Sequence, residues 1–314
     1  MTAIKTFNEL GAHDVALAGG KGASLGEMTQ AGVPVPNGFV VLASAFENFL
    51  EVTDINIEIS SLLGSVNHDE VHTVEYASGK IQSLILDATM PEDIAEEIRV
   101  AFKTLNAQYV AVRSSATAED SGSAAWAGQL ESYLNTTEHN LLENVKRCWA
   151  SLFTPRAIFY RFEKKLGSEH IAVAVVVQKM VQSEVSGIAF SVHPITEDKN
   201  QLIIEASYGL GEAIVSGQVT PDAYVVEKEP RNILDKNVVS KERGLYWVDG
   251  GKNDWITMGE DRAEKQALSD NEILQLSELV VTVEKHYGFP CDIEWALEGG
   301  KFYIVQSRPI TTLL

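Results

Sequence analysis

Apolar and polar positions predict helices early in the chain and strands later. From residue 55 to residue 107, acidic and apolar residues recur at a spacing close to 3.6, which predicts helices. Short apolar runs then predict strands at 109–112, 171–178, 187–191, 201–206 and 223–227, with more β-structure in 233–248. Residues 141–152, 155–165 and 269–287 have helical patterns. This order predicts an α+β fold, with approximate subdomains 1–108, 109–192 and 193–314.

The last 25 residues predict a β-hairpin. Asp292 and Glu294 end one apolar run, Gln306 and Arg308 end the next, and Glu-Gly-Gly-Lys at 298–301 forms a tight turn between them. Because side chains alternate along strands, residues of matching parity are expected to lie side by side. A carboxylate beside a side-chain oxygen suits Mg²⁺, and a neighbouring arginine suits a polyphosphate. The alternative is a surface cross-strand ion pair, but two carboxylates on one face favour a cation.

Two glycine-rich segments could contact phosphate. In the first, Gly19-Gly-Lys21-Gly opens a helix, where backbone N–H groups and the lysine charge could hold phosphate oxygens. In the second, Arg113 follows a strand, and the small hydroxyl residues and glycines up to Gln129 predict a mobile loop that could fold over phosphates. The alternatives are a plain helix-opening turn and a polar surface loop.

Two further segments are compatible with a nucleotide. The apolar run 175–181 contains Gln178, which could contact an adenine edge, although a buried core strand explains the same pattern. Residues 207–222 are dense in glycine and could form a second phosphate-facing loop, a hinge or a structural turn.

Composition narrows the class of partner. Apolar residues make up 45% and charged residues 22%, which is typical of a globular protein. The net charge of −19 argues against nucleic acid or an anionic membrane as the main partner, but not against ATP held by a local cationic cluster. Two distant cysteines, no signal segment and no 18-residue apolar stretch predict a cytoplasmic protein.

Common nucleotide motifs are absent from the sequence. Gly-Lys occurs at Lys21, Lys80, Lys252 and Lys301, but neither Ser nor Thr follows, so there is no P-loop. Gly209-Leu-Gly211 lacks the third glycine of a dinucleotide fingerprint.

The ordered set of motifs nevertheless resembles one family. The motifs are Gly19-Gly-Lys-Gly-Ala-Ser-Leu-Gly-Glu, Val35-Pro-Asn-Gly-Phe, Arg113-Ser-Ser-Ala-Thr-Ala-Glu-Asp, Ala127-Gly-Gln, Ser151-Leu-Phe, Arg156-Ala, Gly209-Leu-Gly-Glu, Pro221-Asp, Asp292-Ile-Glu-Trp and Gln306-Ser-Arg-Pro. Together they resemble the N-terminal nucleotide-binding domain of phosphoenolpyruvate synthase and pyruvate phosphate dikinase, which rifampicin phosphotransferases also carry. The resemblance implies that residues 1–314 form an ATP-grasp fold, with two lobes around a nucleotide cleft for Mg-ATP.

The resemblance also implies residue roles. They are phosphate contacts from Lys21 and Arg113, a loop over the phosphates containing Gly128 and Ser132, an adenine contact from Gln178, Mg²⁺ ligands Glu294 and Gln306, and stabilisation of the transferred phosphate by Arg308. Lys21, Arg113 and Arg308 would be the catalytic residues. Catalysis would then consist mainly of positioning and charge neutralisation.

Family members continue into a swivelling domain with a phosphorylated histidine, and no such domain is expected in this sequence. The resemblance therefore implies an ATP-dependent phosphotransferase that transfers phosphate to a histidine on a separate or removed domain. This would be the first half-reaction of a phosphoenolpyruvate-synthase-like enzyme. The alternatives are the ATP domain of a rifampicin-type antibiotic phosphotransferase and a non-catalytic ATP-binding subunit.

Overall fold

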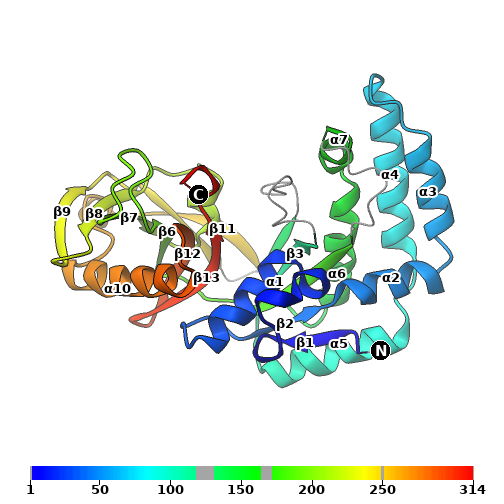
Figure 1. The fold of residues 1–314 in the computed structure, drawn as a ribbon, viewed down its shortest axis with the longest axis horizontal. Coiled ribbons are helices and arrows are strands. Elements are labelled where there is room, and N and C mark those ends of the chain that lie inside the picture. The colour runs from blue at the N-terminus through cyan, green and yellow to red at the C-terminus, as the bar shows by residue number, and fades with distance from the viewer. Residues whose placement is uncertain (1, 118–130, 164–171, 249–250, 314) are drawn as a thin grey trace. The chain divides into compact units, whose positions relative to one another are not determined.

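A computed structural model describes residues 2–117, 131–163, 172–248 and 251–313. The chain forms two compact units, and each is described by itself (Figure 1). Unit 1 comprises Met1–Glu27 and Asn37–Met180, and unit 2 comprises Met28–Pro36 and Val181–Leu314. Boundaries near 108 and 192 were expected. Strands on both sides of residue 108 instead pair within one sheet of unit 1.

Unit 1 is built on a five-stranded sheet of order β1-β2-β5-β3-β4, in which every neighbouring pair is antiparallel. The strands are β1 (Ile4–Thr6), β2 (Gly38–Val41), β3 (Val110–Ala116), β4 (Ser132–Thr136) and β5 (Val173–Lys179). The strands predicted at 109–112 and 171–178 are confirmed, with different ends. In particular, β3 extends to Ala116, because its second half still pairs with β5.

Helices cover one face of this sheet and confirm the helical pattern. They are α2 (Ala43–Val52), α3 (Asn56–Gly64), α4 (Val71–Asp87), α5 (Glu92–Leu105), α6 (Leu141–Ala150) and α7 (Pro155–Glu163). Trp149 of α6 is fully buried, with its ring 5.4 Å from that of Phe46 and 5.0 Å from that of Phe49. Val110 and Val112 of β3 belong to the same core. Burying each such side chain contributes roughly 1.5–3 kcal/mol to the stability of unit 1.

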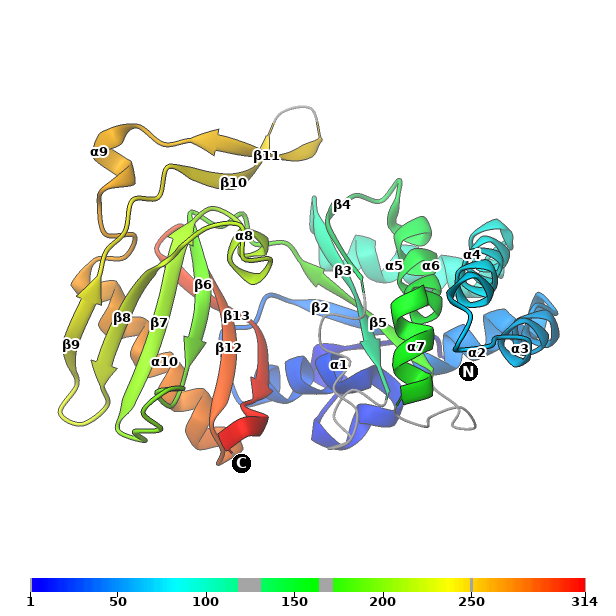
Figure 2. The same ribbon diagram turned by 90° about the horizontal axis from the view of Figure 1, so that it is seen from above.

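Unit 2 is built on a six-stranded antiparallel sheet of order β13-β12-β6-β7-β8-β9. The strands are β6 (Val185–Phe190), β7 (Gln201–Tyr208), β8 (Asp222–Glu227), β9 (Asn232–Asn237), β12 (Cys291–Glu298) and β13 (Lys301–Pro309). The long helix α10 (Asp270–Tyr287) packs along one face (Figures 1 and 2). A capping box begins this helix, since the Ser269 hydroxyl accepts a hydrogen bond from the Glu272 N–H and the Glu272 carboxylate accepts one from the Ser269 N–H.

Alternation along the strands gives the two faces of this sheet different environments. Tyr224 and Trp295 are buried on the face that α10 covers. The other face is half-buried, and we call it the open face; it includes Ile188, Phe190, Ile203, Glu205, Asp292 and Glu294. Polar and apolar side chains therefore share a surface that α10 leaves uncovered.

Smaller elements complete the described residues. They are α1 (Val15–Gln30), α8 (Glu212–Val215), α9 (Glu260–Ala263), the hairpin strands β10 (Arg243–Val248) and β11 (Lys252–Thr257), and 3₁₀ turns at Phe7–Glu9, Ala12–Asp14, Ser151–Phe153 and Thr311–Leu313. Figure 2 shows the β10–β11 hairpin as a separate two-stranded sheet within unit 2. Among the described helices, none is long and apolar enough to cross a membrane.

Candidate functional site

Three of the predicted nucleotide residues lie on one face of the unit 1 sheet. Arg113 of β3 is directly opposite Ser132 of β4. Gln178 of β5 is opposite Ala111, which is two residues from Arg113 and therefore on the same face. Val112 points to the opposite face, into the helical core. The three polar residues consequently face away from that core.

The glycine turn that carries Lys21 packs on the same face. Gly19 interrupts α1 with φ 67° and ψ 171°, and the Gly22 N–H donates to Ser115 Oγ at 3.3 Å. Ser115 is two residues from Arg113 along β3, so the turn brings Lys21 into the neighbourhood of the arginine. The predicted turn is confirmed, although α1 begins before it, at Val15.

Gly19 allows this approach because it has no side chain. A Cβ at this position would lie 2.2 Å from Ser115 Oγ and 2.3 Å from its carbonyl oxygen. We expect Gly19→Ala to lower the free energy of unfolding by about 3 kcal/mol, because steric overlap adds to left-handed backbone strain. Gly32→Ala is the control, since Gly32 also has positive φ but faces open space; its expected cost is about 1 kcal/mol. Equal losses in urea denaturation would contradict the packing argument.

Gln178 is only 2% exposed, and its Nε2 atom has no hydrogen-bond partner within the part of the chain that the structure describes. A buried donor without a partner costs roughly 1–3 kcal/mol. An acceptor atom on a bound ligand could offset this cost. The side chain is therefore chemically suited to contact a heterocycle such as adenine.

The predicted loop between β3 and β4 is described only at its ends. Arg113 was expected at a strand end, but it lies in the middle of β3, because pairing with β5 continues for three more residues. Gly128 lies outside the described residues. Ser132, at the start of β4, is exposed.

The closing hairpin of unit 2 is confirmed. Gly299 and Gly300 form a two-residue connection, with φ values of 57° and 73°. Positive φ at both positions is characteristic of the type I′ turn that joins tightly paired antiparallel strands. β12 and β13 therefore pair directly from Glu298 and Lys301 onwards.

A β-bulge in this hairpin brings the predicted residues onto one face. From the turn as far as Trp295 and Ile304, the two strands pair residue by residue. The register then shifts by one residue, so that Glu294 lies opposite Gln306. Val305 is the extra residue. Without the bulge, Glu294 would oppose Val305, and Gln306 would point to the other face. The shift thus brings the carboxylate and the amide together on the open face.

Asp292 and Arg308 form the adjacent cross-strand pair. Arg308 Nε and one terminal nitrogen lie 2.8 Å and 2.7 Å from the same Asp292 oxygen, Oδ2. The Asp292 side chain is 14% exposed and that of Arg308 is 49% exposed. This contact holds the guanidinium at the strand while leaving it accessible.

The ion pair between Asp292 and Arg308 weakens the case for a metal that rests on two neighbouring carboxylates alone. Because Arg308 offsets the charge of Asp292, the two carboxylates on β12 do not by themselves require a cation. Among the described residues, no group of three or more His, Cys, Asp or Glu side chains could hold a metal. Glu294 and Gln306 do offer hard oxygen donors, which fit Mg²⁺ when a polyphosphate supplies further oxygens.

Glu205 is a third carboxylate on the open face, and no motif in the sequence indicates it as a site residue. The pairings Glu294–Ile188 and Ile188–Glu205 place it in the same cross-strand row as Glu294. Burial raises the pKa of Glu205, and the negative charge of Asp292 raises it further. The alternating pattern of 201–206 predicted the strand, but the proximity of Asp292 depends on a sheet neighbour almost 90 residues away.

This pKa shift predicts a pH-dependent stability. The folded state retains the Glu205 proton at pH values where the unfolded chain loses it, above the ordinary glutamate pKa of about 4.5. The contribution of protonated Glu205 to the free energy of unfolding is therefore complete below that pH. It is lost as the pH rises through the pKa of Glu205 in the folded state. Glu205→Gln should therefore match wild type near pH 4 and be more stable at pH 7 in urea denaturation. A stability difference that does not change with pH would contradict this assignment.

Comparison with known proteins identifies the family. The model for the AMP/ATP-binding domain of pyruvate phosphate dikinase matches residues 15–313, so the chain belongs to this family. A probable phosphoenolpyruvate synthase of Methanocaldococcus jannaschii is 46% identical over the whole chain, and one of Archaeoglobus fulgidus is 49% identical over 96% of it. The rifampicin phosphotransferase of Bacillus subtilis is 37% identical over 97% of the chain.

The chain matches only part of each relative. It spans 27% of the Methanocaldococcus protein, 40% of the Archaeoglobus protein and 36% of the Bacillus protein. Family membership makes the chain an ATP-binding domain of a phosphotransferase family. The α+β class is confirmed, and two mixed units agree with the two lobes of an ATP-grasp fold.

Proposed function

We propose that the chain binds Mg-ATP and donates its phosphate in the first half-reaction of a phosphoenolpyruvate-synthase-like enzyme. The observation that carries this proposal is the arrangement on β12 and β13, where Glu294 opposes Gln306 and Asp292 holds Arg308 in the next pair. One short surface thus offers oxygen ligands for a metal beside an oriented guanidinium. This combination suits Mg²⁺ bound together with a phosphoryl group.

In this proposal the unit 1 residues also contribute to nucleotide binding. Lys21 and Arg113 neutralise phosphate charge, and Ser132 and Gly128 belong to the segment over the phosphates. Gln178 contacts the adenine, which is supported by its buried and unpartnered Nε2 among the described residues. Binding would then combine positive charge at one end of the ligand with an amide donor at the other.

Glu294 and Gln306 are the proposed Mg²⁺ ligands. Mg²⁺ usually keeps one or two protein oxygens together with phosphate oxygens and water, and the donor set on the hairpin fits this pattern. A bound Mg²⁺ would supply charge neutralisation at the phosphates. Asp292 orients Arg308 toward the same region by holding two of its nitrogens.

The proposed acceptor is a histidine on a separate or removed swivel domain. The chain's own residues would position the phosphoryl group and offset its charge, with no covalent intermediate on this chain. This activity is compatible with the cytoplasm, since Cys148 and Cys291 are buried free thiols. Neither nucleic acid nor membrane is a proposed partner, because the net charge is −19.

A second candidate is the ATP domain of an antibiotic phosphotransferase. The 37% identity to the Bacillus subtilis rifampicin phosphotransferase favours it. The two candidates share the ATP half-reaction and differ in the final acceptor. Supplying the phosphorylated histidine domain with pyruvate or rifampicin would distinguish them.

Isothermal titration with a non-hydrolysable ATP analogue, with and without Mg²⁺, tests the nucleotide site. We expect binding that strengthens with Mg²⁺. A second step mixes the chain with radiolabelled ATP and a histidine-bearing swivel domain, and acid-labile label on that domain is expected. Nucleotide binding without transfer would favour a binding subunit, and no binding under either condition would reject the proposal.

A further inference from the structure

Residues 209–222 of unit 2 are joined to residues 239–248 and to Asn253 by a series of contacts. In chain order these are the Leu210 N–H to the Leu245 carbonyl at 2.7 Å, Asn253 Nδ2 to Glu212 Oε2 at 3.4 Å, Arg243 to the Gln218 carbonyl at 3.3 Å, and the Val239 N–H to Asp222 Oδ1 at 3.0 Å. We call residues 209–222 the wall segment and the described residues 239–248 and 251–253 the brace. The brace follows the wall segment from one end to the other.

The first contact is tight enough to require glycine. Gly209 has φ +83°, and a Cβ there would lie 2.1 Å from the Leu245 carbonyl oxygen. Its own carbonyl accepts a hydrogen bond from Ser186 Oγ at 2.6 Å. The wall segment is therefore held between β6 and the brace where it begins.

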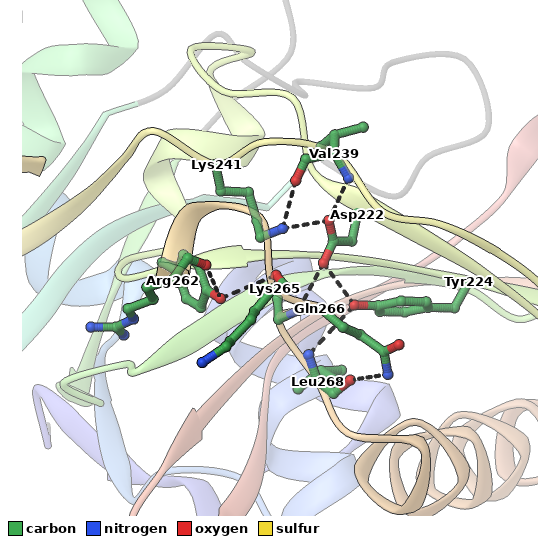
Figure 3. A network of polar contacts seen from close by, with 10 residues as sticks. Asp222, Tyr224, Val239, Lys241, Arg262, Lys265, Gln266 and Leu268 are labelled. Atoms are coloured by element: carbon green, nitrogen blue, oxygen red, sulfur yellow. Dashed lines mark hydrogen bonds and ion pairs between the residues drawn. The ribbon is translucent and has the colours of Figure 1, made fainter. Parts of the chain in front are cut away.

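The last contact centres on the buried carboxylate of Asp222 (Figure 3). One oxygen accepts from Lys241 Nζ at 2.7 Å as well as from Val239. The other accepts from the Tyr224 hydroxyl at 2.9 Å and the Ala267 N–H at 2.8 Å. Four donors thus converge on one carboxylate from β8, from the start of the brace and from the chain that leads into α10.

Lys241 balances this charge inside the protein. Both side chains are 0% exposed, and Lys241 Nζ also donates to the Val239 carbonyl at 2.8 Å. A buried ion pair with satisfied hydrogen bonds tolerates little displacement, because moving one partner leaves the other charged and desolvated. The pair therefore fixes the end of the wall segment to the start of the brace.

The wall segment begins at the end of the open face. Ser186, which holds Gly209, lies two residues from Ile188 on β6, so about 7 Å separates it from the row containing Glu205 and Glu294. Helix α8, within the wall segment, also contacts β6. Asp222 lies on the face covered by α10, so the segment wraps around the end of the sheet.

We propose that the Asp222–Lys241 pair is a positioning device for nucleotide binding. By fixing the brace, it holds the wall segment as a rigid boundary at the end of the open face, although neither residue touches the ligand. This inference rests on the proposed function, because it assigns the open face to the nucleotide. It predicts that the pair controls ATP affinity through the order of the wall segment.

The test compares Lys241→Met and Asp222→Asn/Lys241→Met with wild type, by titration with the ATP analogue and Mg²⁺ and by hydrogen exchange at a temperature where all three are folded. We expect Lys241→Met to weaken binding about tenfold and to raise exchange in 209–222 and 243–248, but not in α10. The double variant has no uncompensated buried charge, so it should regain thermal stability without regaining affinity. Lys236→Met/Asp270→Asn, which removes an exposed ion pair between β9 and α10, should leave both readouts unchanged.

The outcomes separate this inference from the proposed function. If wild type does not bind the analogue, the proposed function fails. If wild type binds but the variants bind equally well, or if affinity returns together with stability in the double variant, the positioning role is overturned. If Lys241→Met does not fold, the double variant decides between these outcomes, because its affinity and local exchange are measured against wild type directly.

Discussion

Replacing Arg308 with alanine is expected to slow phosphate transfer to a histidine domain by about 1000-fold. An arginine beside a transferring phosphoryl group offsets charge that develops in the transition state, and such residues contribute factors of roughly 10³ to 10⁵. Asp292 holds the guanidinium through Nε and one terminal nitrogen, so little reorganisation is needed. Rapid-quench measurement of phosphohistidine formation at saturating Mg-ATP would give the rate of this step.

Two variants test whether geometry or charge matters at this position. Arg308→Lys keeps the charge but cannot reproduce the two-nitrogen contact with Asp292, so an intermediate rate is expected. Lys301→Ala removes a cation from the other end of β13, where the ammonium lies 4.8 Å from the Tyr303 ring, and should change the rate less than twofold. An Arg308→Ala rate within tenfold of wild type would rule out the assigned role.

The closing hairpin shows both what sequence patterns can predict and where they fail. Glu-Gly-Gly-Lys at 298–301 predicted the turn because two adjacent glycines permit a type I′ geometry. Matching parity correctly placed Glu294 and Gln306 together, but a regular hairpin from this turn would have separated them. The bulge at Val305 restores the match. A bulge depends on the twist of the strands and on packing against β6, and the alternation of residues along a strand carries no information about either.

In unit 1 the sequence predicted the elements better than their ends. The apolar run before Arg113 predicted a strand, but pairing with β5 extends that strand beyond the arginine. The glycine turn around Lys21 was predicted from composition. Its position against β3 depends on the close approach of Gly19 to Ser115, which lies 96 residues later in the chain. Such contacts depend on tertiary packing and leave no local periodic signal.

The buried ion pair between Asp222 and Lys241 could not be predicted from the sequence. Pro221-Asp222 was noted as part of a motif, yet Lys241 had no pattern to distinguish it from a surface lysine. Lysine is seldom fully buried, so the default expectation is exposure. The burial of Lys241 depends on two acceptors, the Asp222 carboxylate and the Val239 carbonyl, and Asp222 is itself held by the Ala267 N–H.

Glu294→Gln is expected to weaken ATP binding in the presence of Mg²⁺ but not in its absence. With Mg²⁺, loss of the carboxylate ligand should weaken binding about 100-fold, or about 2.7 kcal/mol. Without Mg²⁺, the same change removes a negative charge near the phosphates, so affinity should stay equal or rise slightly. Gln306 would remain as a neutral oxygen donor opposite the substituted residue. Calorimetric titration of wild type and Glu294→Gln, each with and without Mg²⁺, measures these changes in affinity directly.

This dependence on Mg²⁺ distinguishes a metal ligand from a residue that merely stabilises the sheet. Glu227→Gln provides the matched control, because it removes one carboxylate from β8 on the same open face, in a different cross-strand row. A general effect of surface charge would strengthen ATP binding in both variants and both conditions. A structural defect in Glu294→Gln would weaken binding regardless of Mg²⁺. Only loss of a metal ligand makes the magnesium-dependent part of the affinity disappear while binding of free ATP persists.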